Sequence, residues 1–364
     1  MIALIRELAD RLLGRGEASI TVPPFDGALK PNRLLEEADV FAEFAEPEDL
    51  ATDGKALFIA DGNRLWRHAD NQLVQLATFE QPLTALCCLP DGALAVALNG
   101  KAIRIIGGPN DGQSWHEVGG KSLNAVNALS ASPDGKLLAT DGSRAQPYER
   151  WCHDLMERGQ SGRVLLLDPS GPQHQVLAEG LGYAFGVCAA GNDILVSESW
   201  RHRIVSLKSQ PAKPVLASLP AYPSRLALAS AGGFWLTAFT ARTQLVEFVL
   251  REAAYRRRMM KEIEPRYWVA PRLSSDNTFL EPLQGAHIKT MGILKPWAPP
   301  KSYGLVIRIS SEGLPLYSLH SRADGSNHGV VAAVQCGNDL FVLAKGRRRI
   351  LRLSVAAIEE GLRI

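Results

Sequence analysis

The feature that most constrains the fold is a repeated unit, plainest between Asn124 and Leu207. One copy begins NAVNALSASPDGKLLATDGS, and the next begins YAFGVCAAGNDILVSESW. Each copy has an apolar segment, a Pro-Asp-Gly or Gly-Asn-Asp turn, a second apolar segment that ends in a small or acidic residue, and an alternating third strand. Short strands spaced about 8–12 residues apart, with polar turns between them, are typical of a propeller blade.

Four further copies extend this unit along the chain, and they begin at Pro47, Pro82, Ala221 and Gly329. Although 364 residues would permit two or three domains, a repeat architecture of this length forms a single one. The sequence therefore predicts an all-β, six-bladed β-propeller over residues 46–364, preceded by an N-terminal helix and a lead-in segment over residues 1–45.

The fifth copy contains the largest insertion, at about residues 241–301. Its first part, Thr243 to Glu264, is predicted to be one helix that ends before Pro265. The residues expected on the buried side of that helix are Leu245, Phe248, Val249 and Tyr255. We expect the insertion to lie over one face of the propeller as a lid that shields a pocket at the central channel, with surface decoration as the alternative.

Composition excludes several classes of function. The 40 basic and 38 acidic residues give a formal charge of +2, so no overall field favours nucleic acid. The five cysteines include no CxxC pair and no Cys/His cluster, which argues against a zinc site or a disulfide framework and favours a reducing, cytoplasmic location. Motifs of the GxSxG, P-loop, GxGxxG and HExxH kinds are absent from the sequence.

The first 16 residues, MIALIRELADRLLGRG, carry too many charges and are too short for a signal peptide or a transmembrane segment. Ile2, Ile5, Leu8 and Leu12 instead indicate an amphipathic helix. We expect its apolar side to pack against the body of the protein, and weak contact with a membrane surface is the alternative.

Candidate site residues follow from the repeat, because the residues just before each innermost strand converge on the mouth of the channel. Counting back from each turn glycine gives one position per blade: Glu48, Thr84, Asn127, Phe185, Ser224 and Val330. Glu48 and Asn127 offer oxygens for a hard cation such as calcium, which takes about six to eight of them. His328 is a candidate general base, with a structural histidine as the alternative.

The segments that carry these positions resemble the strictosidine synthase-like family of six-bladed propellers, a relative of the gluconolactonase/regucalcin and paraoxonase groups. The segments are FDGALKPNRLLEEA, EPEDLATDGKALFIADG, VNALSASPDGKLLATDGS, YERWCHDLMERGQSGRVLLLDPSG, ILVSESWRHRIVSL and YPSRLALASAGGFWLTAF, followed by the terminal blade. They cover nearly the whole chain in the family's order, so the resemblance implies the same fold.

The resemblance also implies a ligand set. In the related metal-dependent lactonases and esterases, a Glu, two Asn and an Asp from successive blades hold a calcium-type ion. Glu48 and Asn127 match that set, whereas Phe185 stands at the second Asn and Ser224 at the Asp. Calcium is thus the implied cofactor, although two of its four expected ligands are replaced. The plant Pictet–Spengler enzymes use a glutamate of the last blade, where this sequence has Ala332.

These observations predict a small-molecule pocket at the channel, with an aromatic floor. The side chains expected around it are Glu48, Asn127, Ser224, Arg225 and His328, above Phe185 and Trp200. The first hypothesis is a lactone or ester hydrolase in which Glu48 and Asn127 orient a water or a metal ion and His328 is the base. The alternatives are a non-catalytic propeller that binds a small ligand or a protein, and a lyase or condensing enzyme of the strictosidine synthase type.

Overall fold

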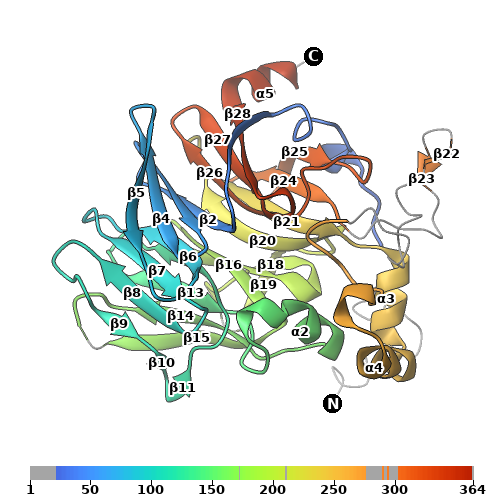
Figure 1. Ribbon diagram of the computed structural model, residues 1–364, viewed down its shortest axis with the longest axis horizontal. Helices are drawn as coiled ribbons and strands as arrows, with labels where there is room; N and C mark the ends of the chain where they lie inside the picture. Colours follow the sequence, from blue (N-terminus) through green and yellow to red (C-terminus); the bar gives the residue numbers. More distant parts are fainter. Residues whose placement is uncertain are drawn as a thin grey trace.

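The computed structural model describes residues 22–171, 173–209, 211–275, 289–290, 293–294 and 302–362. The predicted N-terminal helix, with Ile2 and Ile5, lies outside the described residues. Within them, six four-stranded antiparallel sheets form a six-bladed β-propeller (Figure 1), so the predicted fold is confirmed. No helix in these ranges is long and apolar enough to cross a membrane.

The first three blades follow the repeats in order. Blade one consists of β2 (Pro47–Thr52), β3 (Leu57–Asp61), β4 (Arg64–Ala69) and β5 (Gln72–Thr78). Blade two consists of β6 (Leu83–Cys88), β7 (Leu94–Leu98), β8 (Ala102–Ile106) and β9 (Ser114–Trp115). Blade three consists of β12 (Val126–Ala131), β13 (Leu137–Asp141), β14 (Gly162–Leu167) and β15 (His174–Leu181), and the hairpin β10 (Glu117–Val118) and β11 (Lys121–Ser122) precedes it.

The last three blades complete the ring. Blade four consists of β16 (Ala184–Ala190), β17 (Asp193–Glu198), β18 (Arg203–Ser206) and β19 (Lys213–Leu216). Blade five consists of β20 (Ala221–Leu228), β21 (Phe234–Ala241), β24 (Gly304–Ile309) and β25 (Pro315–Ser321). Blade six consists of β26 (Val330–Cys336), β27 (Asp339–Ala344), β28 (Arg349–Ser354) and β1 (Asp39–Glu43). The inner strands contact one another in the closed order β2, β6, β12, β16, β20, β26 and back to β2.

Strand β1 closes the ring by joining the two ends of the chain. It pairs antiparallel with β28, with Asp39 opposite Arg352 and Glu43 opposite Arg349. The predicted division at residue 45 therefore cuts through the sixth sheet, because the lead-in supplies the outermost strand of that blade.

The short strands form because each blade is buried on both faces by its neighbours. Strand β7, with the sequence LAVAL, is buried at every position, and so is β3. Small residues such as Ala95 and Ala97 alternate with branched ones such as Val96, and all three are inaccessible to solvent. This alternation lets adjacent sheets pack face to face at the narrow inner end of the blades.

Every inner strand also has a β-bulge near its beginning. The pairing register with the second strand shifts at Glu48, Thr84, Asn127, Phe185–Gly186, Ser224–Arg225 and Val331. Five of these sites coincide with the positions predicted to face the channel. The sixth prediction, Val330, is wrong by one residue, because Val330 stays paired with Ala344 and the bulge falls on Val331. A bulge leaves its extra residue unpaired in the ladder, so its carbonyl group needs another partner.

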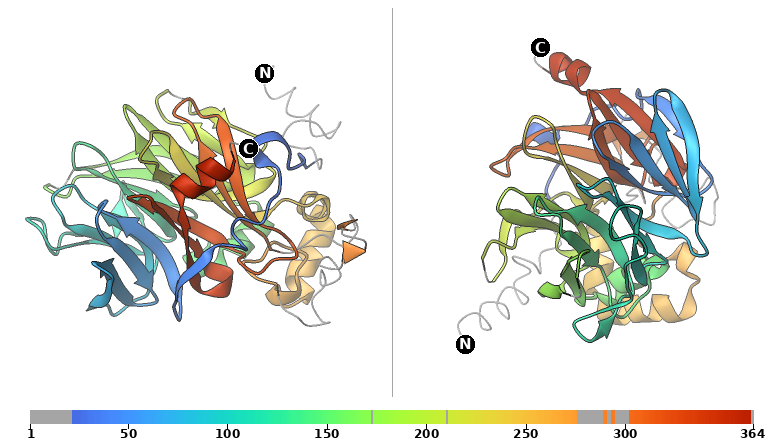
Figure 2. Two further views of the ribbon diagram at one scale, coloured as in Figure 1. Left: turned by 90° about the horizontal axis from the view of Figure 1, so that it is seen from above. Right: turned by 90° about the vertical axis from the view of Figure 1, so that its left-hand side faces the viewer.

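Two helical insertions lie between the second and third strands of their blades. Helix α2 (Trp151–Glu157) is in blade three, and α3 (Gln244–Arg251) and α4 (Ala253–Glu262) are in blade five. Figure 2 shows these helices on one side of the propeller and α5 (Val355–Gly361) on the other. The short hairpin β22 (Lys289–Thr290) and β23 (Ile293–Leu294) belongs to the blade-five insertion. The 3-10 turns are η2 (Gly27–Leu29), η3 (Tyr148–Arg150), η4 (Ser199–Arg201), η5 (Pro265–Tyr267) and η7 (Lys345–Arg347).

The single helix predicted for Thr243 to Glu264 is therefore wrong, since the backbone leaves the helical conformation at Glu252. Thr243 caps α3 by accepting a hydrogen bond from the Val246 amide. The buried residues are Val246 and Val249 in α3 and Met259 in α4, whereas the predicted Phe248 and Tyr255 are 45% and 53% exposed. The prediction is thus right for Val249, while Leu245 is half-buried and Phe248 and Tyr255 are exposed.

Candidate functional site

The guanidinium group of Arg225 lies at the axis of the propeller and binds the bulged residues of other blades. It donates to the carbonyl oxygens of Glu48 (3.1 Å), Thr84 (2.8 Å) and Asn127 (3.0 Å), and makes a longer contact of 3.5 Å with that of Val331. One side chain from blade five thus joins blades one, two, three and six. The bulges free these carbonyl groups, and the five-donor fork of arginine can bind several of them at once.

Hydroxyl groups bind the carbonyl groups at the remaining bulges. Thr140 donates to the carbonyl oxygen of Phe185 at 2.7 Å, and Ser197 donates to that of Ser224 at 2.5 Å. Thr237 donates to the carbonyl oxygen of Val331 at 3.1 Å. Each donor lies on the second strand of one blade and its acceptor on the first strand of the next, so these bonds also fix neighbouring blades against each other.

The charge of Arg225 is balanced by Asp49. The Arg225 Nε lies 3.1 Å from Asp49 Oδ1, and both side chains are nearly excluded from solvent. The Asp49 carboxylate also accepts hydrogen bonds from the amides of Leu50 and Leu86, each at 2.8 Å. Burial raises the pKa of Asp49 to about 6, although Arg225 opposes that shift. The Arg225 pKa is raised further by Asp49 despite its burial, so the guanidinium stays charged.

An aromatic pocket lies next to this cation. The ring of Phe185 faces the guanidinium at 5.4 Å and contributes to the pocket wall. The side chains that line the pocket are Tyr148, Trp151, Tyr183, Phe185, Trp200, Phe239, Leu273, Val331 and Lys345. The pocket holds about 20 Å³, enough for one water molecule, because the rings pack closely against one another.

The insertions form part of this pocket. Trp151 belongs to α2, and Leu273 follows η5 in the blade-five insertion. Val249 and Trp268 of the same insertion share one hydrophobic cluster with Phe185. The described part of the insertion therefore covers the pocket, as expected of a lid.

Glu48 is held between two polar residues of the pocket. Its carboxylate accepts a short hydrogen bond from the Tyr148 hydroxyl and pairs with Lys345 Nζ at 2.5 Å. The Lys345 ammonium lies 5.4 Å from the centre of the Tyr148 ring. Burial and the neighbouring Glu48 carboxylate hold the pKa of Tyr148 well above its ordinary value, so its phenol remains a donor. Blades one, three and six each supply one member of this triad.

The ring nitrogens of His328 are hydrogen-bonded to residues other than Glu48, Tyr148 and Lys345. His328 Nδ1 lies 2.7 Å from Ser302 Oγ, and its Nε2 lies 2.7 Å from the carbonyl oxygen of Arg322. A carbonyl oxygen accepts only, so Nε2 carries a proton and donates to it; in the neutral ring, Nδ1 then accepts from Ser302. The side chain is 4% exposed and does not line the aromatic pocket. The structure thus does not bring His328 together with Glu48.

The other predicted residues separate into two groups. Phe185 and Trp200 line the pocket as expected. Ser224 is buried and does not line the pocket, and its hydroxyl lies 2.8 Å from Thr237 Oγ1 and 3.1 Å from the carbonyl oxygen of Val330. The Asn127 amide donates to the carbonyl oxygen of Ala184 at 2.8 Å and accepts from Tyr183 at 3.3 Å.

The residues at the axis do not fit the calcium ion that the resemblance implies. Arg225 binds the carbonyl oxygens of the bulges, and the oxygens of Glu48 and Asn127 are bound by other side chains. Within the described ranges, no group of three or more His, Cys, Asp or Glu side chains is placed to hold a metal ion. A metal at this position would compete directly with a buried guanidinium.

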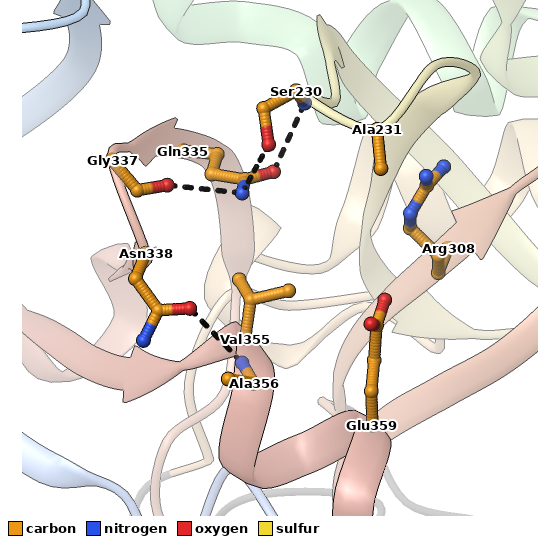
Figure 3. A pocket seen from close by; sticks show the side chains of 9 residues that line it. All are labelled: Ser230, Ala231, Arg308, Gln335, Gly337, Asn338, Val355, Ala356 and Glu359. Atoms are coloured by element: carbon orange, nitrogen blue, oxygen red, sulfur yellow. Dashed lines mark hydrogen bonds between the residues drawn. The ribbon is translucent and has the colours of Figure 1, made fainter.

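A second, larger cavity of about 280 Å³ lies between blades five and six, beside α5 (Figure 3). Its polar residues are bound to one another: Gln335 donates to Ser230 at 2.6 Å and to the Gly337 carbonyl at 3.1 Å. Arg308 lines this cavity but donates to the carbonyl oxygens of Ile309 and Gly232, both at 2.6 Å. The aromatic pocket is the better candidate, because four blades and both insertions converge on it.

The fold and the site together define a class: six-bladed propellers with a pocket lined mainly by aromatic side chains beside the central channel. Adipocyte plasma membrane-associated protein of Salmo salar is 25% identical over 357 residues, which cover 86% of this chain and 76% of that protein. Protein STRICTOSIDINE SYNTHASE-LIKE 13 of Arabidopsis thaliana is 28% identical over 138 residues, 36% of this chain and 34% of that protein. The chain is thus a homologue of strictosidine synthase-like proteins, and the predicted resemblance is confirmed.

Solved structures agree on the fold. A gluconolactonase from Xanthomonas campestris superposes with a TM-score of 0.55 at 16% identity, covering 92% of this chain and 95% of that one. No family model matches the sequence.

Sequence reasoning missed both residues that bind the Glu48 carboxylate, Tyr148 and Lys345, and also the apolar and aromatic lining residues Trp151, Tyr183, Phe239, Leu273 and Val331. Tyr148 and Lys345 lie in loops between the second and third strands, outside the repeat positions that were compared. Tyr148 is in the insertion QPYERWCHD, whose cluster of aromatic residues is unusual for a polar loop and was an available signal. Lys345 has no such signal, because a lysine after a strand is ordinary.

Proposed function

We propose that this strictosidine synthase-like propeller acts on a small, largely apolar organic molecule in the aromatic pocket, as a lactone or ester hydrolase that uses Glu48. The observation that carries the proposal is the Glu48 carboxylate held between the Tyr148 hydroxyl and the Lys345 ammonium, whose side chains both line the pocket. A carboxylate between two hydrogen-bond donors, beside an apolar cavity, is suited to proton transfer on a bound carbonyl compound.

In the proposed reaction, Glu48 accepts a proton from a water molecule as its oxygen attacks the carbonyl carbon of the substrate. The Lys345 ammonium has N–H groups beyond the one bound to Glu48, and one of them donates to the carbonyl oxygen as it becomes negatively charged, while the Tyr148 hydroxyl keeps Glu48 in place. When the tetrahedral intermediate collapses, the bond to the leaving oxygen breaks and that oxygen takes the proton from Glu48. The products are a carboxylic acid and an alcohol, and in a lactone both remain in one molecule.

The lining of the pocket supports a proposal for the class of substrate. Six of its lining residues are aromatic, so the acyl or alcohol part should be apolar and flat. Because the present cavity holds about 20 Å³, the substrate must displace side chains as it enters. Trp151 and Leu273 are the residues to move, since both belong to insertions and are only partly buried.

The test compares hydrolysis of phenyl acetate and of an aryl-substituted lactone by the wild type and two variants. Glu48→Gln should lower kcat by at least about a hundredfold, the usual contribution of a general base, with an unchanged circular dichroism spectrum. Glu46→Gln is the matched control, because Glu46 is exposed and only two residues away, and its rates should equal those of the wild type. Wild-type rates in Glu48→Gln would refute the proposed site.

A second candidate function is a propeller that binds an aromatic ligand without turnover. The observation that favours it is that both oxygens of Glu48 are already bound by protein groups. Trp151 and Trp200 lie at the pocket, so ligand binding should quench their fluorescence. Saturable quenching by phenyl acetate without any release of phenol would favour this second function over hydrolysis.

A further inference from the structure

We propose that Arg225 is a built-in cation that takes the place of a channel metal, and that removing its side chain converts the axis into a calcium-binding site. This inference concerns the architecture of the channel and does not depend on the reaction proposed for the pocket. It rests on the groups that surround the guanidinium, on its burial and on its charge partner.

The surroundings of Arg225 resemble a coordination shell. Three backbone carbonyl oxygens from three blades approach the guanidinium at 2.8–3.1 Å, namely those of Glu48, Thr84 and Asn127. A carboxylate oxygen of Asp49 lies 3.1 Å from Nε. Carbonyl and carboxylate oxygens are the donors that calcium prefers. Here a side chain of the protein itself is the positive charge that they share.

Burial keeps the Arg225 guanidinium paired with Asp49 and out of contact with solvent ions. Arg225 is 6% exposed and Asp49 is 2% exposed, so the pair is shielded from salt and water. A divalent ion at the same oxygens would lie within a few ångströms of the guanidinium, and at that distance in a protein interior the repulsion is large. The wild-type channel therefore has no place for a metal while Arg225 keeps these contacts.

Truncation of Arg225 would leave an unbalanced set of oxygens. The carbonyl oxygens of the three bulges would lose their donor, and Asp49 would lose its counter-charge. Calcium accepts about six to eight oxygens in flexible arrangements, so water can complete the shell around these four. Magnesium should bind less well, since it requires a nearly ideal octahedron.

The experiment measures melting temperature and calcium binding for the wild type and Arg225→Ala. Wild-type melting should be the same in chelator and in millimolar calcium. Arg225→Ala should melt several degrees lower in chelator, and calcium but not magnesium should restore most of that loss, because a ligand that binds only the folded state stabilises it. Calorimetric titration should then show about one calcium ion per chain in the variant.

Two controls separate this outcome from general loss of a buried arginine. Arg308 is also buried, and its guanidinium donates to two carbonyl oxygens and lies 5.4 Å from the centre of the Trp235 ring. Within the described residues, however, it forms no ion pair with a carboxylate. Arg308→Ala should therefore be destabilised without any response to calcium. Arg225→Ala combined with Asp49→Asn should lose the calcium response as well.

The proposal is overturned if Arg225→Ala folds and its melting temperature ignores calcium. It is also overturned if the wild type, purified without chelator, contains about one tightly bound calcium ion per chain and melts lower when the ion is removed. If Arg225→Ala does not fold, the wild-type measurement still tests whether Arg225 takes the place of a channel metal. Failure of the hydrolase assays would leave these results unaffected, because neither readout depends on turnover.

Discussion

Substitution of Phe239 tests directly whether the aromatic rings of the pocket pack closely against one another. Phe239 lies in β21, is 2% exposed, and its ring centre is 5.3 Å from that of Trp151 and 5.8 Å from that of Tyr222. Two further rings, of Phe185 and Trp200, lie at 6.2 and 6.4 Å. Replacing Phe239 by alanine should therefore remove several favourable ring contacts and leave a cavity in the pocket wall.

The expected cost is about 3–5 kcal/mol, the range for a buried phenylalanine replaced by alanine. Ring pairs of this geometry add about 0.5–1.5 kcal/mol each beyond buried area, which places Phe239→Ala toward the upper end. The free energy of unfolding should be measured by guanidinium titration, followed by circular dichroism and by tryptophan fluorescence. Toluene should stabilise the variant more than the wild type, because the enlarged pocket can bind it.

Phe248→Ala is the matched control, since Phe248 lies on the exposed side of α3 and is 45% accessible to solvent. Its effect should stay within about 0.5 kcal/mol. A cost below about 1 kcal/mol for Phe239→Ala would mean that the ring is not closely packed, and the account of the pocket would be wrong.

Two further predictions concern stability. Burial lowers the pKa of His320 to about 4, so the folded state binds this proton less tightly than the unfolded state does. The free energy of unfolding should therefore be highest above about pH 6.5 and fall by about 3 kcal/mol as the pH drops to 4. His320→Gln should remove most of this pH dependence from the unfolding profile. Gly186→Ala should destabilise the protein by more than about 1 kcal/mol, because a Cβ there would lie 2.6 Å from a carbonyl oxygen of the next blade. Gly361→Ala is the control, since a Cβ there meets no atom within 4 Å, and its free energy of unfolding in the guanidinium titration should be nearly unchanged.

The fold could be predicted because turns and inner strands of similar length recur in every blade. Counting back from the turn glycine located the bulges at Glu48, Thr84 and Asn127. The bulge lies 8 positions before the glycine in blades two and three and 6 positions before it in blade one. The count failed by one at Val331, where only the pairing of the two strands defines the bulge. Register is a property of two strands together, so one strand's sequence does not determine it.

The site could be predicted only in part. Phe185 and Trp200 were expected in the pocket and line it. Arg225 was expected to bind substrate, yet its donors are bound to backbone carbonyl groups of other blades. The partners of His328, Ser302 and the Arg322 carbonyl, come from neighbouring segments of the fold whose approach has no signature in a single sequence.

The most direct test of the central claim is a crystal structure of the purified protein, with anomalous data collected at a long wavelength to reveal calcium. The account predicts that the Arg225 guanidinium lies at the axis, within hydrogen-bond distance of the Glu48, Thr84 and Asn127 carbonyl oxygens, with no anomalous peak among them. An anomalous peak bound by those oxygens, with Arg225 turned away from the axis, would contradict it.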